Sequence, residues 1–223
     1  MTKAVIFDLF ETLVTEWGHE KYTKRMMCAD LGVSADDFSP LWEELHDRQY
    51  RGEITFADSL RYVCGKLGVP LCDDTLAYVT DRRITTKSAC FDSLHPGIIP
   101  MLKRLRACGY KLAILSNCSE EEVRTIRESS LAPLFDEIVL SYETGLCKPD
   151  TAIYELTANR LGVDVRDCVF IGDGGSRELY GAVESGMRAY RAMWYIREMP
   201  HEIKPMPEFD VFYEPDDVVI NVN

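Results

Sequence analysis

Short apolar runs alternate with longer stretches of helical spacing along most of this chain. The first run, residues 4–7, is too short for a helix and is rich in β-branched and aromatic residues, which predicts a buried strand. It ends at Asp8, a charged residue at the point where a strand leaves its sheet. Ligands of open parallel sheets bind beyond the carboxyl ends of the strands, so Asp8 is a candidate nucleophile or metal ligand and Thr12 a candidate to hold an oxyanion. A buried strand that merely ends on a solvated aspartate would show the same pattern.

Residues from about 16 to 90 have few β-branched runs and place their apolar side chains at helical spacing instead. Glycine and proline positions interrupt this spacing and divide the stretch into short helices. The expected helices cover about residues 19–31, 34–51, 55–67 and, from 73 or 74, at least the stretch to 79. Such a series after a single strand predicts an inserted helical bundle that covers another part of the molecule.

From His95 onward the two patterns alternate. Strands are expected over residues 111–117, 137–141, 167–172, 188–192 and 210–213. Helices are expected over residues 97–108, 120–129, 150–161 and 178–185, and from 215. Strands that alternate with helices predict an α/β fold with a doubly wound, mostly parallel sheet. A proline-containing loop, residues 199–207, is expected between the last two strands.

Composition and charge narrow the classes of partner. The chain has 223 residues, of which 46% are hydrophobic, which suits one large α/β domain or a core with a smaller inserted unit. Its formal net charge of −12 argues against a nucleic-acid backbone or an anionic membrane as partner, although a local cationic site still permits a phosphorylated small molecule. No apolar run reaches the roughly 18 residues that a membrane span needs.

The cysteines and histidines show no metal-binding pattern. The 8 cysteines include no CxxC pair, and the 4 histidines match no zinc spacing. No export signal is recognisable at the N-terminus, so a cytoplasmic protein with free, buried thiols is expected.

Polar residues that suit phosphoryl chemistry follow later strands. Ser116 and Asn117 offer a hydroxyl and an amide beside a helix start, where backbone N–H groups favour anions. Lys148 precedes a helix that begins with proline, and its ammonium would neutralise both an aspartate and a phosphoryl group. Asp173 and Glu178 offer the carboxylate oxygens that Mg²⁺ prefers. Each feature alone is common in turns or on surfaces, but their combination is specific.

These residues resemble the motifs of the haloacid dehalogenase (HAD) superfamily, along essentially the whole chain. The stretch from Asp8 to Thr12 resembles the nucleophile motif, Ser116 the second motif, Lys148 the third, and Asp173 with Glu178 the acidic fourth. The resemblance implies a Rossmann-like core, residues 1–14 plus 91–223, with a helical cap, residues 15–90. It also implies a covalent intermediate on Asp8.

The family's phosphatases hold magnesium between the nucleophile, the main-chain carbonyl two residues later and the acidic motif. In this chain the resemblance therefore implies a Mg²⁺ site formed by Asp8, the carbonyl of Phe10, Asp173 and Glu178.

Phe10 departs from the phosphatase pattern. Most family phosphatases carry an aspartate there as general acid and base, a group that typically contributes ~10² to 10⁴ in rate. Neighbouring residues on a strand or tight turn point in different directions, so the sequence alone does not assign Glu11 the role of that acid. The family's haloacid dehalogenases resemble this chain in having an aromatic residue at this position and a Ser-Asn pair. They use no metal, however, whereas the acidic motif here is of the metal-dependent type.

Three functions follow from these conflicting signals. The first is a Mg²⁺-dependent hydrolase of a small phosphorylated metabolite, in which Asp8 attacks and Lys148 stabilises charge. Within it, Thr12 and Ser116 would hold the phosphoryl oxygens, and Asn117 and Phe10 would contact the substrate. The first is favoured because carboxylates near one lysine would repel each other without a cation. The second is hydrolysis of a 2-haloacid, and the third is a HAD-like binding protein with weak turnover.

Substrate identity and oligomeric state are not readable from the sequence. Trp17, Tyr22 and Arg51 lie in stretches that would contribute to specificity, although each is more commonly structural. Arg177, between the two acidic residues of the fourth motif, is expected only to orient those carboxylates.

Overall fold

The computed structural model describes residues 1–199 and 203–222, and its centre is a parallel sheet. The 6 strands lie in the order β3-β2-β1-β4-β5-β6, which confirms the α/β prediction. Their bounds are β1 (Ala4–Phe7), β2 (Lys111–Ser116), β3 (Glu137–Leu140), β4 (Cys168–Gly172), β5 (Arg188–Ala192) and β6 (Val211–Phe212). In this order the chain reverses its direction of strand addition between β1 and β4, and such a switch point opens a crevice at the carboxyl ends of those strands.

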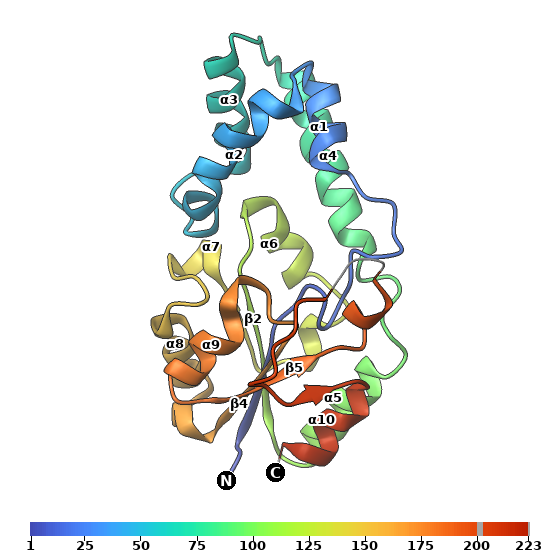
Figure 1. Ribbon diagram of the computed structural model, residues 1–223, viewed down its shortest axis with the longest axis vertical. Helices are drawn as coiled ribbons and strands as arrows, with labels where there is room; N and C mark the ends of the chain where they lie inside the picture. The colour runs from blue at the N-terminus through green and yellow to red at the C-terminus, as the bar shows by residue number, and fades with distance from the viewer. Residues whose placement is uncertain (200–202, 223) are drawn as a thin grey trace.

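Helices cover both faces of the sheet, as Figure 1 shows. Because side chains alternate along a strand, Val5 and Phe7 of β1 pack on one face while Ala4 and Ile6 pack on the other. The first face is covered by α5 (Ile98–Ala107) and α10 (Pro215–Asn221), and the second by α8 (Thr151–Leu161) and α9 (Glu178–Glu184). Two shorter helices, α6 (Glu120–Arg127) and α7 (Ser141–Thr144), follow β2 and β3 at their carboxyl ends.

The helices between β1 and α5 form a layer of their own above these strand ends (Figure 1). They are α1 (Lys24–Leu31), α2 (Ala35–Tyr50), α3 (Phe56–Leu67) and α4 (Asp73–Ala89). Thr23, Ser34 and Thr55 cap the first three by accepting a hydrogen bond from a backbone N–H of the first turn. Their apolar faces meet in a separate buried cluster around Phe38, Leu60 and other residues of α1–α4.

A few elements differ from expectation. The first helix begins at Lys24 and not near residue 19, because Thr23 takes the extended conformation of a cap. The short helix α7 was not predicted, since it follows β3 directly, its N-cap position is Leu140, and it is a single turn long. Residues 200–202 of the expected 199–207 loop lie outside the described residues.

Two expectations from composition concern cysteines and membranes. All cysteines are free, and all but Cys72 and Cys108 are buried. Within the described residues, no helix is both long and apolar enough to cross a membrane.

Candidate active site

The ends of β1 and β4 place two aspartates side by side. Asp8 follows β1, and its backbone N–H donates to the carbonyl of Ile171 on β4 at 2.8 Å. Asp173 follows the end of β4, one residue past Gly172. Both lie at the switch point of the sheet, where parallel topology opens the ligand crevice. Asp8 is only 6% exposed, so this crevice is a poorly solvated place for a carboxylate.

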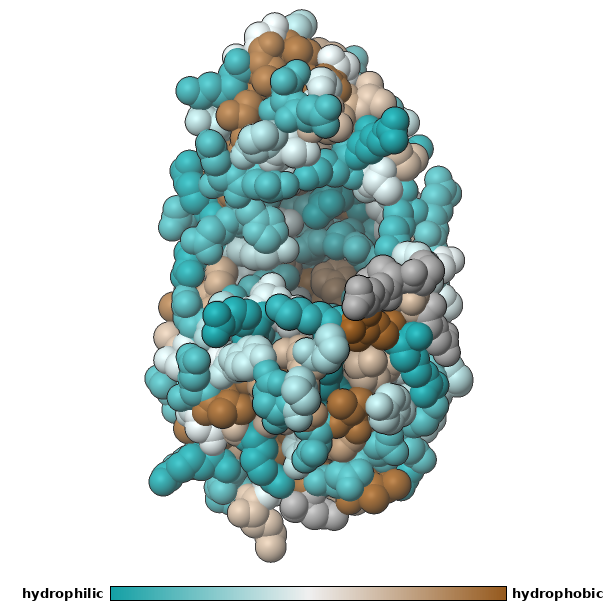
Figure 2. Space-filling view, in the orientation of Figure 1, coloured by the Kyte–Doolittle hydropathy of each residue, from teal (hydrophilic) through white to brown (hydrophobic). Residues whose placement is uncertain are grey.

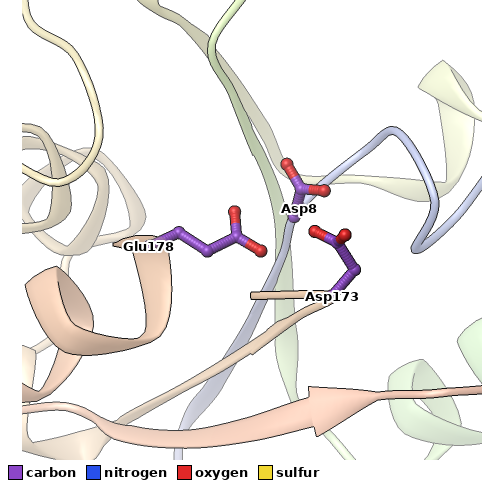
Figure 3. Close-up of side chains that lie close together, drawn as sticks. All are labelled: Asp8, Asp173 and Glu178. Carbon is purple, nitrogen blue, oxygen red and sulfur yellow. The ribbon is translucent and has the colours of Figure 1, made fainter. Parts of the chain in front are cut away.

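Glycines bring Glu178 to the same point. A Cβ at Gly172 would lie 2.1 Å from the Oε1 of Glu178, and a Cβ at Gly181 would lie 2.3 Å from the carbonyl of Pro149. The first glycine therefore makes room for the carboxylate, and the second lets α9 approach the segment that carries Lys148. One carboxylate oxygen of each of Asp8, Asp173 and Glu178 lies within 4.8 Å of the others, and Figure 3 shows the three groups pointing toward one another.

Lys148 is the cation of this cluster. Its Nζ donates to Oδ1 of Asp8 and, at 2.5 Å, to Oε2 of Glu178. Asn117 fixes the lysine backbone, because its Oδ1 accepts from the Lys148 N–H at 2.8 Å and its Nδ2 donates to the Lys148 carbonyl at 2.9 Å. Asn117 thus has both amide atoms engaged in holding Lys148.

The cluster has more negative than positive charge. Burial alone would lower the pKa of Lys148, but the charges of Asp8 and Glu178 outweigh it and raise that pKa, so the lysine stays charged. Burial, followed by the charge of Asp8, raises the pKa of Asp173 and raises the pKa of Glu178 well above its usual range. Carboxylate oxygens are the donors that a magnesium ion takes, and the three carboxylates carry more charge than one ammonium can balance. The residues present therefore fit a magnesium ion.

The turn after β1 gives its residues different surroundings. Leu9 and Leu13 are fully buried beneath this turn, which lets Phe10 and Glu11 reach the cavity above it. The Glu11 carboxylate accepts from the Thr15 hydroxyl and, at 3.1 Å, from the backbone N–H of Glu16. The Glu11 carboxylate is therefore held by its own turn.

The structure separates the two predicted hydroxyl groups. Ser116 lines the cavity, where its hydroxyl donates only a long bond, 3.3 Å, to the carbonyl of Asn117. Thr12 is fully buried and is not among the residues that line the cavity, and its Oγ1 has no hydrogen-bond partner among the described residues. The Thr12 carbonyl accepts from the indole of Trp194 at 2.7 Å, which anchors the turn.

Of the residues predicted for the catalytic, substrate-binding and metal sites, all except Thr12 line one cavity of about 280 Å³, which also contains residues that the sequence did not single out. Lys87 of α4, Tyr50 of α2, and Glu16 and Glu122 complete the wall. Figure 2 shows the surface hollowed between the upper helices and the sheet-bearing part. Burial raises the pKa of Tyr50 to about 12, so its phenol stays protonated at neutral pH.

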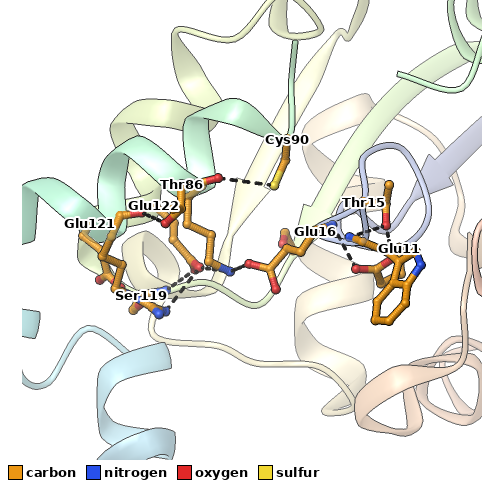
Figure 4. Close-up of polar contacts among 12 residues, drawn as sticks. Glu11, Thr15, Glu16, Thr86, Cys90, Ser119, Glu121 and Glu122 are labelled. Carbon is orange, nitrogen blue, oxygen red and sulfur yellow. Dashed lines mark hydrogen bonds and ion pairs between the residues drawn. The ribbon is translucent and has the colours of Figure 1, made fainter. Parts of the chain in front are cut away.

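Lys87 belongs to a second, partly buried cluster of charges, between α4 and α6. Its Nζ lies 2.5 Å from Glu16 and 2.7 Å from Glu122, and 4.2 Å from the centre of the Phe10 ring. Arg83, one turn earlier, pairs with Glu121 and, at 3.6 Å, with Glu122. Figure 4 shows these acidic residues at the two ends of the cluster. The i, i+4 spacing of Arg83 and Lys87 indicates that both cations lie on one face of a helix, but nothing in the sequence locates their acidic partners.

The remaining candidates lie elsewhere. Tyr22 is buried and donates to Asp30 at 2.8 Å, and Arg51 pairs with Asp47 and Asp150. Trp17 lines a neighbouring pocket. Arg177 forms no bond with either acidic residue of the fourth motif among the described residues, and its guanidinium lies 5.3 Å from the centre of the Tyr180 ring.

Comparison with known proteins gives consistent matches over the chain. A family model described as haloacid dehalogenase-like hydrolase matches residues 2–186. The chain is 26% identical over 220 residues to a glyceraldehyde 3-phosphate phosphatase from Methanopyrus kandleri, covering 95% of this chain and 93% of the relative. It is 27% identical over 185 residues to an (S)-2-haloacid dehalogenase from Pseudomonas putida, covering 76% and 75%.

Solved structures share the fold. A 2-haloacid dehalogenase from Pseudomonas syringae superposes with a TM-score of 0.69 at 22% identity, covering 100% of this chain and 98% of the other. A haloacid dehalogenase family enzyme from Bacteroides thetaiotaomicron, in complex with magnesium and inorganic phosphate, gives a TM-score of 0.60 at 19% identity, covering 86% and 94%.

Proposed function

Because the chain belongs to the haloacid dehalogenase-like hydrolases, we propose that it is a Mg²⁺-dependent phosphatase of a small phosphorylated metabolite. The excess of carboxylate in the catalytic cluster, defined as Asp8, Lys148, Asp173 and Glu178, carries this proposal. One lysine leaves the buried carboxylates undercompensated, and a divalent cation would remove that deficit. The glyceraldehyde 3-phosphate phosphatase among the relatives is consistent with this activity.

Each residue of the cluster has a proposed role. Asp8 attacks the phosphorus, and the Lys148 ammonium compensates charge on the attacking carboxylate and on the transferred group. Asp173, Glu178 and Asp8, with the Phe10 carbonyl, would hold Mg²⁺, which supplies charge stabilisation when bound. Ser116 binds a phosphoryl oxygen from the cavity wall. Asn117 acts by fixing Lys148, and Thr12 by shaping the turn below Phe10.

The helical layer of residues 15–90 is proposed to act as a cap. Its helices share a buried cluster of their own, while α2 and α4 contribute Tyr50 and Lys87 to the cavity above Asp8. A layer with its own core can cover the reacting groups and exclude water without disturbing the sheet.

Hydrolysis of an aryl phosphate tests the proposal. Its leaving group needs little protonation, so the absence of a carboxyl group at Phe10 does not mask the chemistry. Phosphate release is expected with Mg²⁺ and is expected to stop in excess chelator. No release under either condition would overturn the proposal.

The variant Asp8→Asn tests the assigned nucleophile. It keeps the shape of the side chain but removes the attacking carboxylate, so turnover should vanish while the circular dichroism spectrum is unchanged. Asp81→Asn, at an exposed position of α4, is the matched control and should behave as the unaltered protein. Retained turnover in Asp8→Asn would assign the chemistry to another group.

A specific observation favours 2-haloacid hydrolysis as the second candidate. Phe10 offers no proton, and a halide leaving group needs none, so displacement at carbon by Asp8 is compatible with this wall of the cavity. Several relatives are (S)-2-haloacid dehalogenases. Halide release from a 2-haloacid that continues in excess chelator would establish this function in place of the first.

A further inference from the structure

A second hollow of about 560 Å³ adjoins the catalytic cavity. The two share Glu11, Asp173 and Gly175 in their walls, so a molecule of modest length can occupy both. The second hollow, called the distal pocket here, is bounded by the loop after β4, by Lys204 and Met206 before β6, and by Trp17.

The distal pocket is rich in cations although the protein is strongly acidic. Its wall contains Lys21, Arg177, Arg191 and Lys204, against the carboxylates of Glu11 and Asp173. Asp173 belongs to the catalytic cluster, and Glu11 accepts hydrogen bonds from its own turn. Among the residues that the structure describes, none of these four cations forms an ion pair. The cations of this wall thus outnumber its carboxylates in a chain of net charge −12, which favours an anionic ligand.

Arg191 is the fixed element of this wall. It is 8% exposed, and its Nε and Nη1 donate to the carbonyls of Asp173 and Lys204 at 2.9 and 2.8 Å. Its Nη2 donates to none of the described residues. The guanidinium is therefore oriented by main-chain acceptors, with one nitrogen left for a ligand. It also ties this wall directly to the residue after β4 that belongs to the catalytic cluster.

Glycine and aromatic residues shape the approach to Arg191. Gly174 has φ +99°, and a Cβ there would lie 2.6 Å from the Sδ of Met206 and 3.5 Å from the Nε of Arg191. Lys21 lies 4.9 Å from the centre of the Trp17 ring, and Arg177 lies over Tyr180. These cation–π contacts hold two mobile charged side chains at the pocket.

We propose that the distal pocket binds a second anionic group of the substrate, a carboxylate or a second phosphate, while the reacting phosphoryl group lies at Asp8. This inference rests on the proposed phosphatase function and narrows its substrates to small phosphate esters that carry negative charge at both ends. Arg191 supplies the oriented guanidinium, and Lys21 and Arg177 supply additional positive charge at the opening.

Calorimetric titration of Asp8→Asn in Mg²⁺ with two probes tests the proposal. The probes are 3-phosphoglycerate and glycerol 3-phosphate, which differ by a carboxylate in place of a hydroxymethyl group. We expect 3-phosphoglycerate to bind about tenfold more tightly, as one charge-assisted contact provides. Arg191→Gln, which removes the oriented guanidinium, should reduce this preference to about twofold, and the double variant Lys21→Gln with Arg177→Gln should reduce it in part, whereas Lys103→Gln, exposed on α5, should retain it.

The same titrations on the unaltered protein in excess chelator repeat the comparison without the Asp8 substitution. Equal affinities for the two probes, or a preference that Arg191→Gln and the double variant both retain, would overturn the distal pocket. A preference observed in a protein that releases no phosphate from an aryl ester would overturn the phosphatase proposal and leave the pocket standing. Equal affinities in a protein that hydrolyses the aryl ester would overturn the distal pocket and leave the phosphatase proposal standing.

Discussion

Lys148 and Lys87 both line the cavity above Asp8, and each contacts two carboxylates. Lys148 contacts Asp8 and Glu178 in the catalytic cluster. Lys87 contacts Glu16 and Glu122 in the bridging cluster, which also contains Arg83 and Glu121 and joins α4 to α6. Lys148 is buried and Lys87 is half-buried, but the larger difference between them lies in the charges around them.

The pKa values of Glu178 and Glu122 are shifted in opposite directions by that difference. Burial and the charge of Asp8 raise the pKa of Glu178 well above its usual range, against the effect of Lys148. Glu122 is as deeply buried, but the charges of Lys87 and Arg83 outweigh burial and lower its pKa. The charge of Glu122 is stabilised in the folded protein because two cations lie beside it. The charge of Glu178 is not, because one lysine serves a cluster of three carboxylates. Incomplete compensation marks the site that binds something, and near-complete compensation marks a structural connection.

The largest expected effect comes from removing the catalytic lysine. Lys148→Met should lower kcat/KM for an aryl phosphate by about 10³, the cost of losing one preorganised charge in a buried site. Lys103→Met is the exposed control and should leave the rate unchanged. A Lys148→Met enzyme within tenfold of the unaltered protein would show that this lysine holds the carboxylates without stabilising the reaction.

Phe10→Asp changes a residue of the cavity that both lysines line. A carboxyl group there restores a proton donor, so hydrolysis of an alkyl phosphate should rise by about 10², the low end of the usual range for a general acid. The low end is expected because Lys87, 4.2 Å from the present ring, would favour the ionised form. Aryl phosphate hydrolysis should change little, and Phe10→Asn is the matched control. An equal rise in Phe10→Asn would show that ring size, not proton transfer, limits the enzyme.

Lys87→Met tests whether the bridging cluster is structural. Breaking this pair leaves Glu122, among the described residues, with the Ser119 backbone N–H and the more distant cation of Arg83, which should lower the free energy of unfolding by about 3 kcal/mol. Urea unfolding at neutral pH measures the change, with Lys103→Met expected to stay within about 0.5 kcal/mol of the unaltered protein. A stable Lys87→Met protein with a loss of rate as large as that of Lys148→Met would place Lys87 in the chemistry instead.

The fold was largely predictable because its signals are local. The short apolar runs became strands β1 to β5, and Thr23, Ser34 and Thr55 capped helices close to where capping residues predict them. The start of α1 was misplaced because polar and apolar residues before Thr23 continue the helical spacing without forming a helix.

The catalytic cluster was predictable to a similar degree, because the carboxyl ends of parallel strands lie at the same edge of the sheet, independently of how the side chains pack. Asp8, Ser116 and Asp173 each follow or end a strand, so topology alone brings them together. The bridging cluster and the distal pocket depend instead on how α4 and the 203–206 segment pack against distant parts of the chain. No local pattern specifies those contacts.

The smallest expected effect is on the pH dependence of stability. Glu122 has a folded-state pKa below its unfolded value, so it stabilises the protein above about pH 4.3, the ordinary glutamate pKa, and this contribution is lost as the pH falls through the folded-state value. Glu122→Gln should therefore cost about 2 kcal/mol at neutral pH, less than Lys87→Met because Lys87 and Arg83 keep Glu16 and Glu121 as partners. Urea unfolding from pH 7 to pH 3 should show the difference shrinking.

Glu178→Gln is the matched variant in the catalytic cluster, and its effect on the free energy of unfolding should have the opposite sign. The raised pKa of Glu178 means that its charge costs stability at neutral pH, so in excess chelator the variant should be more stable than the unaltered protein. That gain should disappear as the pH falls below the ordinary glutamate pKa, where the carboxyl is protonated in both states. Two glutamine variants that destabilise alike at pH 7 would contradict the distinction between the clusters, because a carboxylate already compensated by Lys148 would leave no deficit for Mg²⁺ to fill.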